Sequence, residues 1–331
     1  MDGICTLAND VVYDQLVALL NSIEANLGAE TPVCIYPYDD RLERVLEEVS
    51  RRPNVTVYGD RASIDRWETF AKTIWAAHPT AHQQWQRIGS TTEHRLGMHR
   101  RFCGFDGPFD RFIYLDADTL VLGSLQPLFD ALETHDVAVY DFQFKDPSHV
   151  YDVSSPKLNA VFSDERIGSE IFCAGMFAAK RGLFPEETRN ALIRDLSAGD
   201  AEILYAMAPD QTMLNYMVMK TGLSSINFSR TLPKDQVTGC CVTSPHFVPQ
   251  GATLLDHGQP LTYLHYIGLS SSLFTKLCSG DNIDFPYRDL FLHYRYLKNP
   301  GDRPSYKGKP KPYDQPPSII TKLLKKLTPA R

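Results

Sequence analysis

The stretch F-I-Y-L-D-A-D-T-L-V, residues 112–121, places two carboxylates directly after an apolar run. The run itself, from Arg111 to Leu115, does not alternate polar and apolar residues, which is typical of a strand buried on both faces. Such a strand delivers Asp116 and Asp118 to the carboxyl end of a parallel sheet, where open α/β sheets bind their ligands. Because they are two residues apart in extended chain, the two side chains are expected to point the same way. The small Ala117 between them leaves room for a large ligand close to the backbone.

Strand and helix patterns alternate before this stretch. Apolar runs predict strands at residues 3–7, 32–38 and 54–58, and helical spacing predicts helices at 10–27 and 41–51. This β-α-β-α-β order indicates an α/β fold with a mostly parallel, Rossmann-like sheet and helices on both faces. Further patterns predict helices at residues 91–102, 186–196 and 210–220 and strands at 137–142, 171–179 and 261–266.

Composition narrows the class of protein. The 331 residues, 43% of them hydrophobic, supply enough apolar side chain for a substantial core. No apolar run approaches the ~18 to 20 residues that cross a bilayer. The seven cysteines include no C-x-x-C pair, and two of them are the neighbours Cys240 and Cys241, so we expect reduced thiols. With no basic and apolar leader at the start, a cytoplasmic location is expected.

Charge is spread unevenly over the chain. The formal net charge is −6, but Lys and Arg outnumber acids eight to one from Arg303 onward, so this tail carries +7 and the body −13. An acidic body argues against nucleic acid as a partner. Residues 299–331 are predicted to form a basic, Pro- and Gly-rich linker followed by an amphipathic helix at 318–327. That helix could attach the protein peripherally to an anionic surface, the inner face of the membrane. Alternatively, it could dock onto the domain itself.

Other polar residues also follow or begin predicted elements. His265 ends an apolar run and could supply a third metal ligand, although an ordinary half-buried histidine is the alternative. Two converging carboxylates form a hard oxygen site suited to Mg²⁺ or Mn²⁺. Asp210 and Gln211 lie at a predicted helix N-terminus, where they either contact a hydroxyl-rich ligand or simply cap the helix. Residues 6–13 could hold a base and ribose, or merely begin a helix.

In this order along the chain, the motifs resemble those of the retaining GT-A glycosyltransferases of family 8, a group that includes glycogenin and bacterial lipopolysaccharide galactosyltransferases. The resemblance runs from Thr6 to Gly268. It implies a single GT-A catalytic domain at 1–298, with a nucleotide-binding half at 1–118 and a sugar and acceptor half at 119–298, before the tail.

The resemblance also implies roles for individual residues. The family's L-D-A-D motif is present as residues 115–118, and with His265 of the family's H-x-x-G it would hold Mn²⁺ or Mg²⁺ against the diphosphate of the donor, with Gly268 alongside. The D-Q-x-x-L-N motif would lie beside the transferred sugar, and Arg95 is the basic residue expected to touch the donor. Uridine contacts are implied for Thr6, Ala8, Asn9, Asp10 and Tyr13, and sugar-side positions for Cys173, Ala174, Gly175, Asp210, Gln211, Leu214 and Asn215.

Two positions depart from the family pattern. Cys173 stands where the family usually has asparagine in F-N-A-G, so one polar contact to the sugar is lost. Ser271 stands where the family has a lysine on the diphosphate, and Lys276 is the candidate to reach the same phosphates from a longer loop. A missing lysine weakens stabilisation of the leaving group but does not remove the metal ligands.

The implied activity is metal-dependent transfer of a hexose, with retention, from a UDP-sugar to a hydroxyl of a saccharide, lipid-linked or protein acceptor. No carboxylate is an evident nucleophile, so a β-phosphate oxygen would take the acceptor's proton. One alternative is a non-catalytic protein of the same fold that binds a sugar nucleotide or a partner. Another is a haloacid-dehalogenase-type phosphatase, which is disfavoured because its D-x-D-x-T/V motif lies near the N-terminus and Leu120 occupies the fifth position here.

Overall fold

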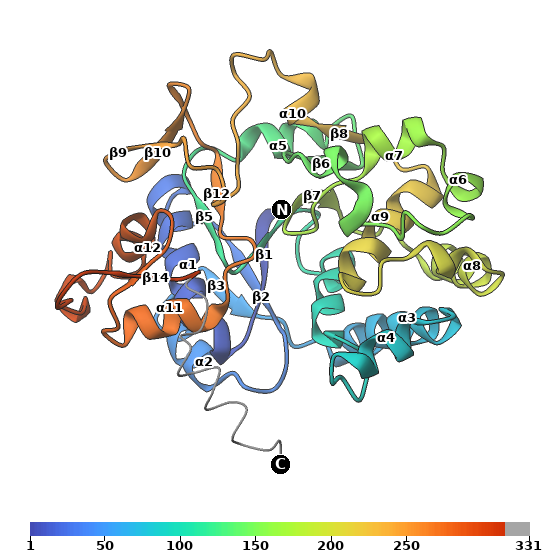
Figure 1. The fold of residues 1–331 in the computed structure, drawn as a ribbon, viewed down its shortest axis with the longest axis horizontal. Coiled ribbons are helices and arrows are strands. Elements are labelled where there is room, and N and C mark those ends of the chain that lie inside the picture. Colours follow the sequence, from blue (N-terminus) through green and yellow to red (C-terminus); the bar gives the residue numbers. More distant parts are fainter. Residues whose placement is uncertain (315–331) are drawn as a thin grey trace.

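A seven-stranded sheet forms the centre of the molecule in the computed structural model, which describes residues 1–314 (Figure 1). Its strand order is β3-β2-β1-β4-β7-β6-β8. The strands are β1 (Asp2–Ala8), β2 (Val33–Pro37), β3 (Val55–Val57), β4 (Arg111–Asp116), β6 (Val137–Val139), β7 (Met176–Lys180) and β8 (Ser225–Asn227). Only β7 runs antiparallel to its neighbours, β4 and β6, so the predicted mostly parallel sheet is confirmed.

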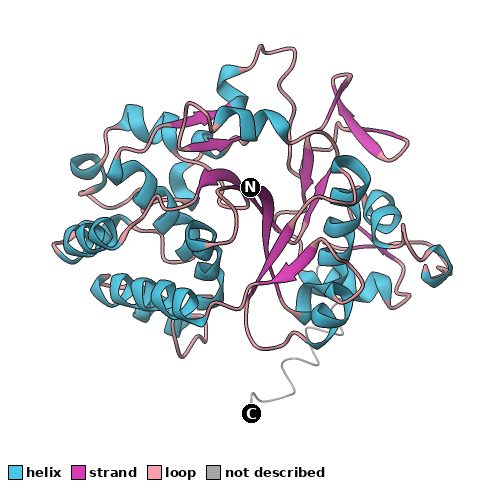
Figure 2. Ribbon diagram, turned by 180° about the vertical axis from the view of Figure 1, so that it is seen from behind, coloured by secondary structure: helices cyan, strands magenta, loops and turns pink. Residues whose placement is uncertain are grey.

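Helices cover both faces of this sheet, as the strand and helix alternation predicts (Figures 1 and 2). The helices are α1 (Tyr13–Leu27), α2 (Glu43–Val49), α3 (Arg61–Ala77), α4 (Ala81–Arg87), α5 (Gln126–Ala131), α6 (Leu158–Val161), α7 (Asp164–Glu170), α8 (Glu186–Ser197), α9 (Pro209–Thr221), α10 (Phe228–Thr231), α11 (Ser271–Cys278) and α12 (Arg288–Arg295). Alternate residues of β1 enter different cores: Cys5 and Leu7 pack on the α3 side, and Ile4 and Ala8 on the α1 side. Burial on both faces explains why the strand patterns are continuously apolar.

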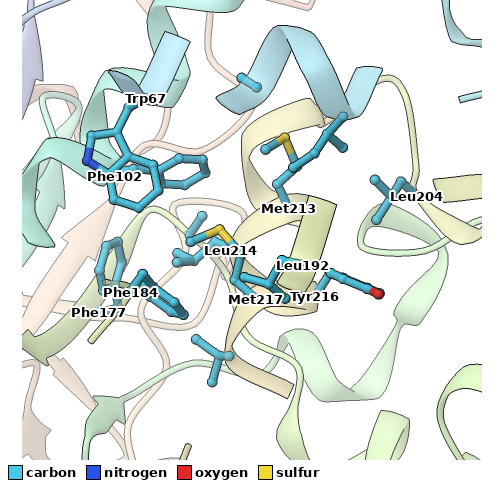
Figure 3. Close-up of a cluster of buried hydrophobic side chains, with 14 of the residues drawn as sticks. Trp67, Phe102, Phe177, Phe184, Leu192, Leu204, Met213, Leu214, Tyr216 and Met217 are labelled. Atoms are coloured by element: carbon cyan, nitrogen blue, oxygen red, sulfur yellow. The ribbon is translucent and has the colours of Figure 1, made fainter. Parts of the chain in front are cut away.

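The core on the α3 side is rich in aromatic and sulfur-containing side chains. Trp67 of α3 packs edge-on against Phe102, and Leu214 and Met217 of α9 fill the space beside them (Figure 3). Helix α3 carries apolar residues at helical spacing, and Asp60 caps it by accepting a hydrogen bond from the Ser63 amide at 3.1 Å. Neither α3 nor α4 is among the helices predicted from the sequence.

A smaller sheet and two helices form a third core. Strand β5 (Thr119–Val121) pairs antiparallel with β12 (Tyr263–His265), and α11 and α12 pack beside them. The expected strand at 261–266 is therefore present but does not join the central sheet. The remaining short strands are β9 (Val248–Gln250), β10 (Thr253–Asp256), β11 (Gln259–Pro260), β13 (Ile283–Asp284) and β14 (Lys311–Pro312).

Three further expectations about local structure need correction. The helix expected at 91–102 is a 3₁₀ segment at Leu96–Asp106. The strand expected at 171–179 begins only at Met176, because the preceding residues are held by side chains of α9. Residues 117 and 118 form a turn between β4 and β5, so the two aspartates do not lie in one extended strand.

The first part of the expected linker is attached to the domain. Strand β14 pairs with β13, the Tyr306 hydroxyl donates to the Leu277 carbonyl at 3.0 Å, and the Asn282 amide donates to the Gly308 carbonyl at 2.8 Å. The predicted helix at 318–327 lies outside the described residues. Among the helices of residues 1–314, none has the length and apolar character needed to span a membrane. All seven cysteines are free thiols, as expected.

Candidate active site

Three potential metal ligands converge at the carboxyl end of β4. Asp116 is the last residue of that strand, Asp118 lies in the turn that follows, and His265 ends β12. The β5–β12 ladder places His265 directly opposite Thr119, one residue beyond Asp118. A hydrogen bond of 2.9 Å from the Tyr266 amide to the Asp118 carbonyl fixes this register. Residues almost 150 positions apart in the chain therefore meet because two short strands pair.

The geometry of these side chains suits a divalent cation. The Nε2 atom of His265 lies 3.2 Å from Oδ1 of Asp118 and 3.9 Å from Oδ2 of Asp116, and one ligand atom from each residue lies within 4.8 Å of the others. Two carboxylates and one imidazole form a donor set that Mn²⁺ or Mg²⁺ accepts, and further positions stay open for oxygen ligands. The three predicted metal ligands are thus brought together.

Gly175 makes room for this cluster. Its amide carbonyl accepts a hydrogen bond from the Asp116 amide at 2.8 Å, because β7 pairs with β4. A Cβ atom at this position would overlap the imidazole of His265 and lie 3.0 Å from Oδ2 of Asp116. The sequence therefore needs glycine here so that the backbone can approach the metal ligands closely.

Electrostatic coupling holds the three groups in a defined charge state. Burial, only partly offset by the Arg101 guanidinium, raises the pKa of Asp116. Burial acts in the same direction on Asp118, but the His265 imidazole outweighs it and lowers the pKa of that carboxyl. Burial would lower the pKa of His265, yet the ion pair and hydrogen bond with Asp118 raise it well above its ordinary value. In the absence of a cation, an imidazolium therefore balances the aspartates.

Arg101 connects the metal ligands to helix α9. Its guanidinium is 1% exposed, and one of its nitrogens, Nη2, lies 3.1 Å from Oδ1 of Asp116 and 3.0 Å from Oδ2 of Asp210. The other, Nη1, donates to the Ala174 carbonyl at 2.6 Å. Burial favours a raised pKa for Asp210, but Arg101, His99 and Arg95 outweigh it and lower that pKa. Asp210 is thus an ionised partner of Arg101 at the start of α9.

Two other residues of the D-Q-x-x-L-N motif hold the chain on the sugar side of the site. Asn215 pairs with both backbone groups of Phe172, accepting from its amide at 2.8 Å and donating to its carbonyl at 2.9 Å. Gln211 accepts from the Ala174 amide at 3.0 Å and donates to the His149 carbonyl at 2.9 Å. The motif therefore fixes the backbone around Cys173, whose thiol has a pKa raised by burial. Leu214 lies in the core beneath (Figure 3).

Asp141 is a buried carboxylate near the same segment that sequence reasoning missed. Its Oδ1 accepts from the Gln143 amide at 2.7 Å, whereas Oδ2 has no hydrogen-bond partner among the described residues. Burial raises the pKa of this carboxyl to about 7. A buried carboxylate oxygen without a partner is costly, and the raised pKa reflects that cost, because protonation removes the buried charge. The sequence does offer a signal, since Asp141 lies near the end of the predicted strand at 137–142, as Asp116 does at the end of β4.

A cavity of about 400 Å³ opens beside the aspartates, between the ends of β1 and β4 and the start of α11. Of the residues predicted to bind a nucleotide, Ala8, Asn9, Arg95 and Ala117 line it together with the aspartates. Lining residues that were not predicted to do so are Leu7, Val11, Val12, Gln15, Tyr38, Arg41, Met98 and Leu269. Ser271, where the family has lysine, also lines the cavity.

The other predicted nucleotide contacts lie elsewhere. Thr6 is fully buried within β1, and Asp10 accepts a hydrogen bond from the Val45 amide at 3.1 Å. The Tyr13 hydroxyl donates to Glu48 at 3.2 Å. Gly268 has a φ of +82°, which favours glycine, and Lys276 is exposed in the last turn of α11. None of these five residues lines the cavity beside the aspartates.

A larger cavity of about 640 Å³ lies among β10, α12 and β14. Its lining includes Phe285, Tyr287, His293 and Tyr313, but it includes none of the three clustered metal ligands. Of these two cavities, the smaller is the better candidate for an active site, because it lies beside the three converging potential metal ligands.

Comparison with known proteins identifies the fold. No protein-family model matches the chain, and no curated protein matches its sequence. Among solved structures, the WbbM bifunctional glycosyltransferase in its apo form is similar with a TM-score of 0.53 and 16% identity over 91% of this chain. The galactosyltransferase LgtC, solved in complex with donor and acceptor sugar analogs, is similar with a TM-score of 0.50 and 16% identity over 88% of this chain. The fold is GT-A. This chain spans 51% of the length of the WbbM chain and 100% of that of LgtC.

Within the GT-A fold, the sequence located the aspartate pair and His265 but missed Arg101. Three arginines, Arg95, Arg100 and Arg101, lie ahead of β4, and the spacing favoured the first. Arg101 is the one that turns inward, which depends on the path of the 3₁₀ segment and leaves no signal in the local sequence. Arg95 remains a candidate ligand contact because it lines the cavity.

Proposed function

We propose that the chain is a retaining, metal-dependent glycosyltransferase of the family 8 type, which moves a hexose from a UDP-sugar to an acceptor hydroxyl. One observation supports this above all: Asp116, Asp118 and His265 converge beside a cavity at the carboxyl edge of a GT-A sheet. The acceptor hydroxyl would belong to a saccharide, a lipid-linked sugar or a protein.

The candidate metal ligands and the cavity would each bind a different part of the donor. Asp116, Asp118 and His265 would hold Mn²⁺ or Mg²⁺, which would supply positive charge to the departing nucleoside diphosphate. Ala8 and Asn9 line the part of the cavity next to β1, where the base and ribose would lie. Arg95 is exposed at the cavity and has no ion-pair partner in residues 1–314, so we assign it to the phosphates that the missing lysine would otherwise contact.

The proposed reaction exchanges one bond at the anomeric carbon for another. The bond from that carbon to the β-phosphate oxygen breaks, the bond to the acceptor oxygen forms on the same face, and the acceptor's proton passes to a β-phosphate oxygen. Gln211 and Asp210 act as positioning residues in this scheme, because their polar groups are engaged with Ala174 and Arg101. We also assign to Asp141 a hydrogen bond with a sugar hydroxyl, because its Oδ2 has no partner among the described residues.

A protein that binds a sugar nucleotide without turnover is the second candidate function, and it is favoured by Ser271 in the cavity. Without a lysine near the diphosphate, the leaving group loses one stabilising charge. A phosphatase is less well supported, because Leu120 occupies the fifth position of the D-x-D-x-T/V motif and the aspartate pair lies more than a hundred residues from the start of the chain.

A screen of nucleotide sugars tests the proposal. We expect one UDP-sugar to raise the melting temperature only with Mn²⁺ present and to be hydrolysed slowly under the same conditions. Asp118→Asn should abolish both effects of the metal, whereas Asp281→Asn, an exposed aspartate of the α11–β13 turn, should leave them unchanged. Stabilisation without hydrolysis would support the binding protein, and full hydrolysis by Asp118→Asn would exclude the metal assignment.

A further inference from the structure

A second cluster of potential metal ligands lies on the hairpins beyond β5 and β12. Asp256 ends β10, and His257 and Gly258 form the two-residue turn that leads into β11. Both turn residues have positive φ, +47° and +88°, as a type I′ hairpin turn requires. His246 approaches from the segment that precedes β9. The three side chains therefore come from two separate stretches of chain.

Both imidazoles converge on one carboxylate oxygen. The Nε2 atom of His246 lies 3.0 Å from Oδ1 of Asp256, and that of His257 lies 3.5 Å from the same oxygen. The two rings face each other at 27° with centroids 5.3 Å apart. With metal–ligand bonds of about 2.0–2.1 Å, neighbouring ligands in a tetrahedral zinc site are roughly 3.3 Å apart. The two distances from a histidine Nε2 to Oδ1 of Asp256, 3.0 Å and 3.5 Å, lie on either side of that value.

A hydrogen bond fixes the orientation of the Asp256 carboxylate. Asp256 is 6% exposed, and its other oxygen, Oδ2, accepts a hydrogen bond from the Gly239 amide at 2.6 Å. That bond leaves Oδ1 free to face the two imidazoles. Carboxylates that bind a metal are commonly oriented by a hydrogen bond of this kind to their other oxygen. A side chain at position 239 would not fit, because its Cβ would lie 2.7 Å from the Phe247 ring and 3.4 Å from Oδ2 of Asp256.

We propose that His246, Asp256 and His257 bind a zinc ion, with water in the fourth position. Two imidazoles and one carboxylate favour a borderline transition metal, in contrast to the aspartate-rich cluster at Asp116, which favours a hard cation. Both histidines are solvent-accessible, so an ion can enter without rearrangement of the fold.

Zinc at this position fastens the β10–β11 turn to the segment that supports His265. Gly239, which binds Asp256, precedes Cys240 and Val242, and these two exchange backbone hydrogen bonds with His265 of 2.7 Å and 2.9 Å. The proposed zinc site therefore acts on stability, and on the backbone behind the first cluster, without contributing a ligand to it.

Zinc binding to the full chain tests the proposal. In the Asp118→Asn background, which disables the first cluster, we expect one equivalent of Zn²⁺ to bind, and Co²⁺ to give the intense visible absorption of a tetrahedral site. His246→Asn and His257→Asn should each weaken Zn²⁺ binding by about tenfold or more. They should also abolish the rise in melting temperature that Zn²⁺ causes. Because both histidines are exposed, the metal-free variants should unfold at the wild-type temperature.

A matched control comes from His149, which is also exposed and lies 3.8 Å from the carboxylate of Asp146, but has no second histidine in its cluster. His149→Asn should leave Zn²⁺ affinity unchanged. Equal Zn²⁺ affinity in the His246 and His257 variants would overturn the proposal. So would the absence of stoichiometric Zn²⁺ from the Asp118→Asn protein, since the ion would then belong to the first cluster. Neither result would bear on the proposed glycosyl transfer, which the Mn²⁺-dependent screen addresses separately.

Discussion

Arg101 is the residue on which the charge balance of the site depends. One fully buried guanidinium faces two carboxylates from different elements, Asp116 at the end of β4 and Asp210 at the start of α9. Two nitrogens of the planar arginine fork reach both carboxylates and the Ala174 carbonyl, whereas a lysine would have to reach all three from a single nitrogen atom. The position of the sugar-side segment and the orientation of a metal ligand are thus coupled through a single side chain.

Arg101→Met should destabilise the protein by about 3–5 kcal/mol, because it leaves two buried carboxylates without a counter-charge. Denaturant unfolding at neutral pH measures the loss. Arg101→Lys should recover part of the stability but not the metal affinity, since it keeps the charge and loses the fork. Arg181→Met removes an exposed partner of Asp110 and should cost far less, because water and salt screen exposed ion pairs. Equal losses in the Arg101 and Arg181 variants would refute the role given to Arg101.

The burial of Asp141 lowers the free energy of unfolding by an amount that depends on pH. Its pKa is raised by burial from 3.8 to about 7, so the folded state holds a proton that the unfolded state has released between these values. Stability therefore falls as pH rises from about 4 to about 7. Asp141→Asn removes this cost, so its melting temperature should exceed that of the wild type increasingly up to pH 7 and by a constant amount above it. A difference that does not vary with pH would show that Asp141 is ionised throughout.

The same variant separates stability from function. If Oδ2 of Asp141 accepts a hydrogen bond from the sugar, Asp141→Asn should lower the turnover of the donor although the protein is more stable. An isosteric amide can still present an oxygen, but it also places an NH₂ group in the pocket. A stable variant with unchanged turnover would remove Asp141 from the donor site.

At the scale of elements, the regular parts of the fold follow from local pattern. The continuously apolar residues of β4 predict a strand, and Pro209 predicts the start of α9. The structure adds that Gly222, with a φ of +68°, ends α9. Helix α3 buries Ile64, Trp67 and Ile74 on one face, and this spacing is itself typical of an amphipathic helix. These elements depend on contacts that lie close together in the chain.

The irregular elements depend on distant contacts and could not be predicted in the same way. The 3₁₀ segment Leu96–Asp106 packs so closely that a Cβ at Gly97 would overlap the Tyr38 carbonyl, and one at Gly104 would lie 2.8 Å from the Phe112 ring. Strand β12 joins β5 instead of the central sheet, and no local pattern specifies that partner. Arg101 and the exact neighbours of His265 are set by these two elements, so the sequence could indicate the three candidate metal ligands but not their surroundings.

Gly175→Ala tests whether the close approach of β7 to the metal cluster matters for function. The added methyl group would overlap the His265 imidazole, so we expect Mn²⁺ affinity to fall by at least about tenfold while the fold is retained. Calorimetric titration with Mn²⁺ measures this change. Gly168→Ala in α7 is the matched control, because no atom lies within 4 Å of its added methyl group. It should leave affinity unchanged and add about 0.5–1 kcal/mol of stability.

At the scale of the whole molecule, the candidate site contains residues from both of the halves that were expected from the sequence. The metal ligands come from both sides of residue 118, so the two expected halves, 1–118 and 119–298, share one centre. The third core, which carries His265, is closed at its edge by residues beyond 298, where Tyr306 packs and its ring lies 5.1 Å from the Arg288 guanidinium. The folded domain therefore includes residues up to at least Pro312.

Two truncations separate this structural role from the predicted membrane contact of the tail. A chain ending at Lys298 loses β14 and Tyr306 and should be less stable than one ending at Asp314 by on the order of 1–2 kcal/mol, since it uncovers apolar surface beside α11. The chain ending at Asp314 keeps these contacts but lacks Lys322, Lys325 and Lys326. It should unfold at the temperature of the full chain and no longer sediment with anionic vesicles, because each lost cation removes up to ~1 kcal/mol of attraction to the surface. Retained sedimentation would exclude the tail as the membrane contact. A lower melting temperature without vesicles would instead mean that residues 315–331 dock onto the domain.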